Sequence, residues 1–402
     1  MNTQDPHFVV ATPNRSVCDD NARALFKAGA LRLIALGTRR GTRGIPDERT
    51  RLNPAIGLVA YAFARTLPTY WGEYVRFGLL PWFDRWVRRQ LTPGDHIISS
   101  FGYANESFKW VRKHGGKTFV DGGNSHIENF WEQISEEHRR WGCSLPPFAP
   151  HWYERSRRMM EHVDFVLSPS QWVTNSFLKR GFSPDQILRN VYPVDLSCFT
   201  PPDQPRPADR PLTIINTGSI SLRKGSPYLL EAFRLIRRSV PDARLLLTQD
   251  IAGSMKDILP QFSDLPIEWS TPLPHAQLAA RLRSADVFVL PSLEEGLART
   301  SLEAMACGLP VVVTAHTGSN DMVKPGVTGE VVPIRDPKAI ADAVLSWWER
   351  IRTGERHEPA FQRDQLSYER FEAEFLAQLA ERGFISLRQR QPEARDAGTP
   401  LP

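Results

Sequence analysis

DVFVLPSLEEGLARTSLEAMACGLPVVV, residues 286–313, carries the clearest structural signal in this chain. Val287–Leu290 and Leu309–Val313 are short apolar runs, typical of buried parallel strands. Thr300–Cys307 lies between them, has a composition that favours helix, and is followed by Gly308, which favours a helix end. The stretch therefore predicts a strand, a loop, a helix and a second strand, the repeating unit of an open parallel sheet.

Glu295 and Glu303 place two carboxylates around the start of this helix. Glu295 falls in the loop after the first strand and Glu303 about one turn into the helix, so both border the crevice where open parallel sheets bind ligands. The free N–H groups of the helix start suit a phosphate, and a carboxylate can accept hydrogen bonds from sugar hydroxyls. Taken alone, the two residues equally suit a charge that favours the helix dipole and a solvated helix side chain.

The segment EGLARTSLEAMACGLPVV (295–312) resembles the E-x7-E signature of the family 4 (group 1) retaining glycosyltransferases. Three other segments resemble the same family more weakly: DFVLSPSQWVTNSFLKRGF (164–182), VDLSCFTP (194–201) and TGSISLRKGSPYLLEAF (217–233). The resemblance implies an α/β protein of the GT-B fold, with two Rossmann-like βαβ domains that face each other across a cleft. It also implies transfer of a sugar from a nucleotide-diphosphate sugar with retention of configuration.

A domain boundary is expected between Pro201 and Pro211, because five prolines there are unsuited to a helix or a central strand. We therefore expect an acceptor-side domain over residues 1–200 and a donor domain over residues 201–365. By the resemblance, residues 366–387 would form a helix that crosses back onto the first domain. The charged tail, residues 388–402, is expected to be disordered.

The resemblance also implies roles for individual residues. Glu295 would hold the donor sugar and Glu303 the ribose, while Lys224 and Arg223 would lie against the diphosphate. His126 would face the donor sugar from the first domain, although a histidine without function at a helix start is the alternative. The other expected donor-binding residues are Gly218, Ser219, Leu273, Gly296, Leu297, Ala298, Arg299 and Thr300.

No D-x-D triplet occurs in the sequence, so the usual aspartate clamp for a metal-bound sugar nucleotide is missing. We therefore expect no metal and no cofactor, with Lys224, Arg223, Arg299 and the helix start at Ala298–Thr300 stabilising the charge of the leaving diphosphate. This chain has Ser219 where the family usually has an arginine, and Ala298 and Arg299 also depart from the usual residues. These departures predict an unusual fit of the donor.

Composition limits the class of protein. The 402 residues are 41% hydrophobic, and the four cysteines are scattered without a C-x-x-C pair, so neither a disulfide framework nor a zinc site is indicated. The start of the sequence has no basic leader, so a cytoplasmic protein is expected. The net charge of +5 is uneven, with thirteen Lys or Arg against four Asp or Glu between Asn21 and Gln90.

The stretch 56–90 mixes aromatic residues with arginines and has two interpretations. It suits an anionic membrane surface, which would place the protein on the inner face of the cytoplasmic membrane. It also suits aromatic packing on the first sheet below a solvated basic face. The expected partners are a nucleotide-sugar donor and a glycan or lipid-linked acceptor, and no nucleic acid.

Two alternative functions use the same kind of scaffold. An NAD(P)-dependent enzyme would need a G-x-G-x-x-G after a strand, which the sequence lacks. A non-catalytic module that binds nucleic acid or membrane through the basic first domain is the other alternative.

Overall fold

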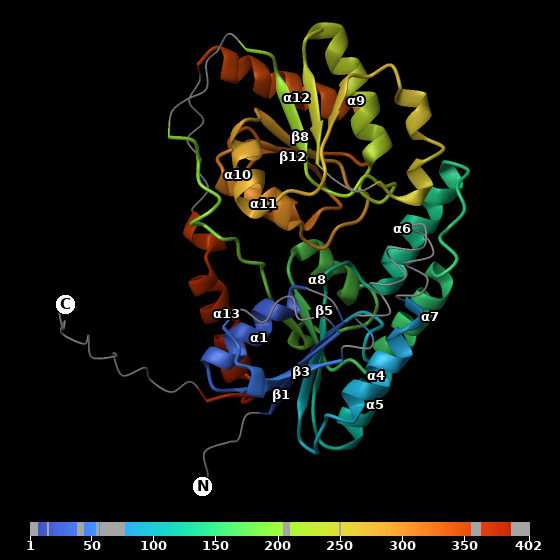
Figure 1. The fold of residues 1–402 in the computed structure, drawn as a ribbon, viewed down its shortest axis with the longest axis vertical. Helices are drawn as coiled ribbons and strands as arrows, with labels where there is room; N and C mark the ends of the chain where they lie inside the picture. The colour runs from blue at the N-terminus through green and yellow to red at the C-terminus, as the bar shows by residue number, and fades with distance from the viewer. Residues whose placement is uncertain are drawn as a thin grey trace, which may run out of the picture.

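The computed structural model describes residues 7–13, 16–37, 44–53, 56, 77–203, 210–248, 251–354 and 363–386. The predicted tail 388–402 and residues 57–76 of the aromatic stretch lie outside these ranges. Within them the chain forms two parallel sheets, which stack one above the other in Figure 1.

The first sheet has seven strands in the order β3-β2-β1-β4-β5-β6-β7. Its strands are β1 (Phe8–Thr12), β2 (Leu31–Leu36), β3 (Thr50–Leu52), β4 (His96–Ser100), β5 (Thr118–Asp121), β6 (Phe165–Ser168) and β7 (Ile187–Arg189). Its helices are α1 (Cys18–Lys27), α4 (Leu80–Arg88), α5 (Asn105–Lys113), α6 (Ile127–Arg140), α7 (Ala149–Met160) and α8 (Gln171–Leu178). Buried residues pack on both faces of this sheet, as an apolar strand pattern predicts.

The second sheet has six strands in the order β10-β9-β8-β11-β12-β13. Its strands are β8 (Thr213–Asn216), β9 (Arg244–Leu247), β10 (Ile267–Trp269), β11 (Val287–Leu290), β12 (Val311–Thr314) and β13 (Gly329–Val332). Its helices are α9 (Ser226–Ser239), α10 (His275–Arg283), α11 (Arg299–Ala306) and α12 (Pro337–Arg352). Helices cover both faces here too, so this sheet also has two buried layers.

The unit predicted from residues 286–313 is present as β11, α11 and β12. All residues of both strands are buried, which explains their nearly continuous apolar sequence. Helix α11 starts at Arg299, one residue before the predicted start, and ends at Ala306. Gly308 follows with φ of 79°, a left-handed conformation that glycine adopts without a steric penalty.

Helix α13 (Tyr368–Glu381) follows the second domain in sequence but packs on the first. Phe371, Phe375 and Leu379 recur on one face and are buried in the same core as Phe8 of β1. Figure 1 shows α13 beside α1. Burying each such side chain contributes roughly 1.5–3 kcal/mol, so this contact ties the end of the described chain to the first domain.

Candidate functional site

The strand order creates one place in the second sheet where two loops meet. Strands β8 and β11 are neighbours, paired through Val287 and Ile214. From β8 the chain continues to β9 towards one edge of the sheet, and from β11 it continues to β12 towards the other edge. Loops that follow such strands at their carboxyl ends enclose the usual ligand crevice of an open sheet. The loop after β8 carries Arg223 and Lys224, and the loop after β11 carries Glu295.

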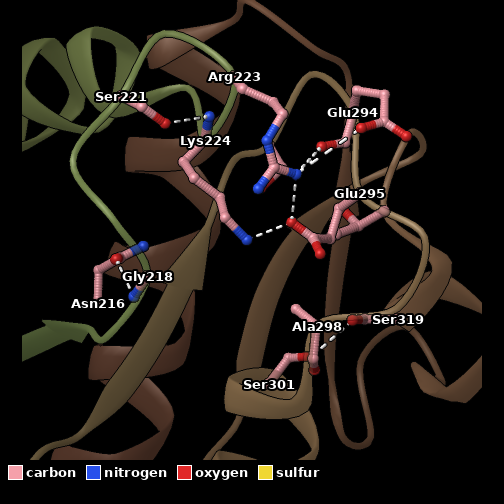
Figure 2. Close-up of polar contacts among 12 residues, drawn as sticks. Asn216, Gly218, Ser221, Arg223, Lys224, Glu294, Glu295, Ala298, Ser301 and Ser319 are labelled. Atoms are coloured by element: carbon pink, nitrogen blue, oxygen red, sulfur yellow. Dashed lines mark hydrogen bonds and ion pairs between the residues drawn. The ribbon is translucent and has the colours of Figure 1, made fainter. Parts of the chain in front are cut away.

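These three side chains converge, as Figure 2 shows. Lys224 Nζ donates a hydrogen bond to Glu295 Oε2, and Arg223 Nη1 donates to the same oxygen at 2.9 Å. Glu295 Oε1 has no hydrogen-bond partner among the described residues. One carboxylate oxygen is therefore held by two cations, while the other can accept a hydrogen bond from a ligand.

The positive charge of this cluster exceeds its negative charge. Burial raises the pKa of Glu295, but Lys224 and Arg223 outweigh this effect, so its pKa lies below the ordinary value and it is ionised. Burial raises the pKa of the neighbouring Glu294 to about 7, so much of it is protonated at neutral pH. Arg223 is 27% exposed at its side chain, so its guanidinium can reach a ligand. Two cations thus face little more than one negative charge, and the surplus favours an anion.

The loop that carries the two cations has a defined conformation. Gly225 has φ of 66°, and a Cβ there would lie 2.8 Å from the Pro291 carbonyl carbon, so no other residue fits without a shift. Lys224 N donates to Ser221 Oγ at 3.2 Å, and Gly218 N donates to Asn216 Oδ1 at 2.8 Å. The cationic side chains are therefore presented by an ordered loop.

The start of α11 borders the same cluster. Ala298 is its N-cap residue and provides no side-chain hydrogen bond, so the first N–H groups of the helix have no cap. Leu297 and Ala298 are buried in the core of the second domain. Thr300 Oγ1 is buried without a hydrogen-bond partner, and Glu303 is buried in the next turn. The arrangement offers polar groups to a ligand at a helix amino terminus.

Arg299 does not point to the cationic cluster. Its guanidinium forms an ion pair with Asp20 at the start of α1 and lies 5.7 Å from the centre of the Tyr192 ring. The sequence interpretation placed Arg299 on the diphosphate, whereas the structure pairs it with the first domain. The reason is geometric, because the first residue of α11 lies against the carboxyl edge of the first sheet.

The structure does not bring His126 to the cluster either. Its ring packs against Phe177 at 5.1 Å and Phe182 at 6.1 Å, and its Nδ1 accepts a hydrogen bond from Glu128 N at 3.3 Å. Burial lowers the pKa of His126 to about 4, so the ring is neutral. His126 caps α6, which corresponds to the alternative of a helix-start histidine.

Two further predicted residues lie in loops of the second domain. Ser219 lies between β8 and α9, and Leu273 lies between β10 and α10, and both are half-buried. Neither makes a hydrogen bond to Glu295 in the part of the chain that the structure describes.

The two domains touch at this site. Ser125 N donates a hydrogen bond to Glu294 Oε1 at 2.8 Å, and Ser170 Oγ donates to the Gly296 carbonyl at 2.6 Å. A Cβ at Gly296 would lie 2.6 Å from the Gly123 carbonyl carbon, so the close approach requires glycine. The loop after β11 is therefore shaped by both domains.

Three residues at or near this site were not predicted from the sequence. Glu294 is fully buried next to Glu295, and its only signal was the pair of adjacent glutamates. Asp20 pairs with Arg299, and no spacing in the sequence indicates that contact. Asp121 ends β5 and accepts hydrogen bonds from Tyr192 Oη at 3.3 Å and Cys18 Sγ at 3.4 Å, and burial raises its pKa to about 6.

Two kinds of feature are absent from the described residues. No group of three or more His, Cys, Asp or Glu side chains among them could hold a metal ion. None of the described helices combines the length and the apolar character needed to cross a bilayer.

Comparisons with known proteins agree with this architecture. The sucrose-phosphate synthase of Thermosynechococcus elongatus superimposes with a TM-score of 0.67 at 19% identity, over 94% of this chain and 98% of that one. Anabaena HepE in complex with UDP and glucose superimposes with a TM-score of 0.62 at 12% identity, over 93% and 99%. Identities this low show the fold alone, and they confirm the predicted GT-B architecture.

The family match lies in the second domain. Residues 211–350 match the family model described as Glycosyl transferases group 1. The GDP-mannose-dependent alpha-(1-6)-phosphatidylinositol monomannoside mannosyltransferase of Mycolicibacterium smegmatis is 32% identical over 209 residues, which are 47% of this chain and 54% of that protein. The match to the curated relatives spans about half of their length. The second domain is therefore similar to the group 1 glycosyltransferases, and the whole chain shares the GT-B fold of the solved structures.

Proposed function

We propose that this protein transfers a sugar from a nucleoside-diphosphate sugar to a glycan or lipid-linked acceptor, with retention of configuration and without a metal ion. The observation that carries the proposal is the convergence of Lys224 and Arg223 on Glu295 Oε2 while Oε1 stays free. In the proposed complex the surplus positive charge stabilises the leaving diphosphate, and Oε1 accepts a hydrogen bond from a sugar hydroxyl.

The names of the similar proteins support the class of donor. The M. smegmatis relative is named as GDP-mannose-dependent, and the HepE structure holds UDP and glucose. Both are consistent with a nucleoside diphosphate as the leaving group here. A protein that assembles polysaccharide on a lipid carrier would work in the cytoplasm, at the inner face of the cytoplasmic membrane, and we propose that location.

Glu295→Gln and Lys224→Ala test the site. Each change removes a group positioned against developing or transferred charge, so we expect donor turnover to fall roughly 100- to 1,000-fold. Circular dichroism should show the same fold, because one side chain is altered in each variant. Glu268→Gln is the matched control, because Glu268 is a partly exposed glutamate of the same domain that pairs with Arg244, and its activity should not change.

Three further measurements separate the parts of the proposal. Thermal shifts with UDP-, GDP-, ADP- and dTDP-sugars should reveal the donor, since a ligand at about 100 times its Kd stabilises by about 2.7 kcal/mol. A chelator should leave turnover intact, and NMR of the product should show the anomeric configuration of the donor. Full activity of both site variants would refute the site, and strict dependence on Mg²⁺ or Mn²⁺ would refute metal independence.

A further inference from the structure

One face of the first domain gathers positive charge away from the donor site. A groove of about 590 Å³ between α4, α5 and α7 is lined by Arg85, Arg88, Lys109, Lys113 and Arg155, and we call it the basic groove. Figure 1 shows α4 and α5 side by side on the part of the first domain that lies far from the second domain. The interdomain cleft therefore stays open to substrates when this face is occupied.

The acidic residues of the groove do not neutralise it. Asp84 is buried and accepts a hydrogen bond from Arg155 Nη2 at 2.7 Å and others from the N–H groups of Glu106 and Ser107. Asp84 and Arg155 thus balance each other. Four cations remain exposed, and Glu106 is the only other carboxylate among the described residues that line the groove.

Within the part of the chain that the structure describes, these four cations have no acidic partner. None of Arg85, Arg88, Lys109 and Lys113 forms an ion pair with any other residue that the structure describes. By contrast, Arg157 and Arg158 on the nearby α7 both pair with Glu154. Clustered cations repel one another unless an anion lies between them, so the groove is suited to a multiply charged anionic surface.

Aromatic groups adjoin the basic groove. Trp82 on α4 is 68% exposed, which is the largest exposure among the large hydrophobic side chains that the structure describes. A neighbouring cavity of about 680 Å³ shares Lys109 and Arg155 with the groove. Its lining is mixed, with the rings of Phe77, Phe148 and Trp152 beside charged residues that include Glu154, Arg158 and Glu161. Aromatic rings beside a cluster of exposed cations match a surface that presents charged headgroups above a hydrocarbon layer.

We propose that the α4–α5 face docks on an anionic phospholipid bilayer, with headgroup phosphates in the basic groove and the Trp82 ring at the membrane interface. Trp rings settle at headgroup depth, and cations near an anionic leaflet bind its phosphates. A nucleic acid could use the same cations, but it does not explain the aromatic cavity. The inference goes beyond sugar transfer, because docking requires neither donor nor acceptor.

Vesicle flotation of the full chain tests the proposal. The protein should float with vesicles of phosphatidylcholine and phosphatidylglycerol, should not float with phosphatidylcholine alone, and should be released by high salt. Each cation contributes about fivefold in affinity, so replacing Arg85, Arg88, Lys109 and Lys113 by Gln should weaken binding roughly several hundredfold. Trp82→Ala should weaken it further without changing the net charge.

Two controls make the result decisive. The quadruple variant loses four charges, so Arg237→Gln, Arg238→Gln, Lys256→Gln and Lys338→Gln together remove the same charge from the second domain, and vesicle binding should persist. Equal loss in both variants, or duplex DNA binding as tightly as the phosphatidylglycerol vesicles and displacing them, would overturn the proposal. Donor-induced thermal shifts of the α4–α5 variant should be unchanged, so failure of docking is distinguished from failure of the donor site.

Discussion

The ionisation and position of the Glu295 side chain depend on its two cationic neighbours. Removed from Lys224 and Arg223, a carboxylate buried to 8% exposure would have a raised pKa and would be partly protonated. The two cations reverse this effect and hold one oxygen in place. Its backbone is also fixed, since Glu295 N donates to the His316 carbonyl at 3.1 Å and Gly318 N donates to the Glu295 carbonyl at 3.0 Å. The carboxylate is thus positioned before any ligand arrives.

Glu294 gives a prediction at this scale. Because burial raises its pKa from 4.5 to about 7, the folded protein keeps a proton that the unfolded chain has lost between these pH values. This group therefore lowers the free energy of unfolding as the pH rises from about 4.5 to 7. In Glu294→Gln the contribution is absent, so the variant should gain stability relative to the wild type over that range, on the order of 1–3 kcal/mol.

Thermal unfolding of both proteins across pH 4.5–7 checks this prediction. His126 and Asp121 also titrate in the acid range, but they are present in both proteins, so their effects cancel in the difference. A difference in stability that does not vary with pH would show that Glu294 is ionised throughout.

At the scale of elements, α6 of the first domain reaches the second domain through a buried carboxylate. Glu137 is fully buried and accepts hydrogen bonds from Tyr228 Oη of α9 at 2.6 Å, from Trp141 Nε1 at 2.9 Å and from Arg335 Nε at 2.7 Å. Tyr228 lies in the first turn of α9, directly after the loop of Lys224. The contact therefore joins α6 to the helix that follows the cationic loop.

Arg335 makes a stabilising ion pair in this contact, but its backbone has an unfavourable conformation. Among the described residues it is the only one other than glycine with a positive φ, at 60°, a conformation that costs a side-chain-bearing residue about 1 kcal/mol. Arg335→Ala should lose the ion pair and keep the strain, whereas Arg335→Gly should lose the ion pair and relieve the strain. Both should unfold at lower temperature than the wild type, and the glycine variant should be about 1 kcal/mol more stable than the alanine variant.

The comparison of the two variants is its own control, because both lack the guanidinium. Equal stability of the two would mean that the backbone at Arg335 is not strained. Stability of both equal to the wild type would mean that Glu137 is satisfied by Tyr228 and Trp141 without the ion pair.

At the scale of the whole molecule, the two domains touch around the loop after β11 and the start of α11. Contacts cross between them at Ser125 and Glu294, at Ser170 and Gly296, and at Asp20 and Arg299. The ring of Trp172 also stacks on His316 at 4.3 Å. Domain interfaces of this polar kind commonly open and close, and closure here would exclude water from the cluster.

Gly296→Ala tests the importance of closure. The added methyl group would meet the Gly123 backbone, which cannot move aside as a flexible side chain can. We expect a larger radius of gyration by small-angle X-ray scattering and a fall in turnover of roughly tenfold or more, since small misplacements of a reacting group are costly. Gly253→Ala is the matched control, because its Cβ would meet nothing within 4 Å. An unchanged radius with full turnover would show that the loop adapts.

The sequence alone was sufficient for the local units and the fold. The apolar runs around residues 286–313 predicted β11, α11 and β12, because burial on both faces requires continuous apolar strands and helix ends require particular residues. The resemblance carried by EGLARTSLEAMACGLPVV predicted the GT-B architecture, which the comparisons confirm. Lys224, Arg223 and Glu295 were named together on that basis, and the structure brings their side chains into contact.

Only the tertiary structure settled the contacts between residues far apart in the chain. The ion pair of Arg299 with Asp20 joins residues 279 positions apart, and the hydrogen bond of Ser125 to Glu294 joins residues 169 apart. The packing of His126 against Phe177 likewise depends on how α6 and α8 meet. Local propensity and periodicity contain no information on such pairs, because their geometry arises only when elements far apart in the chain pack against each other.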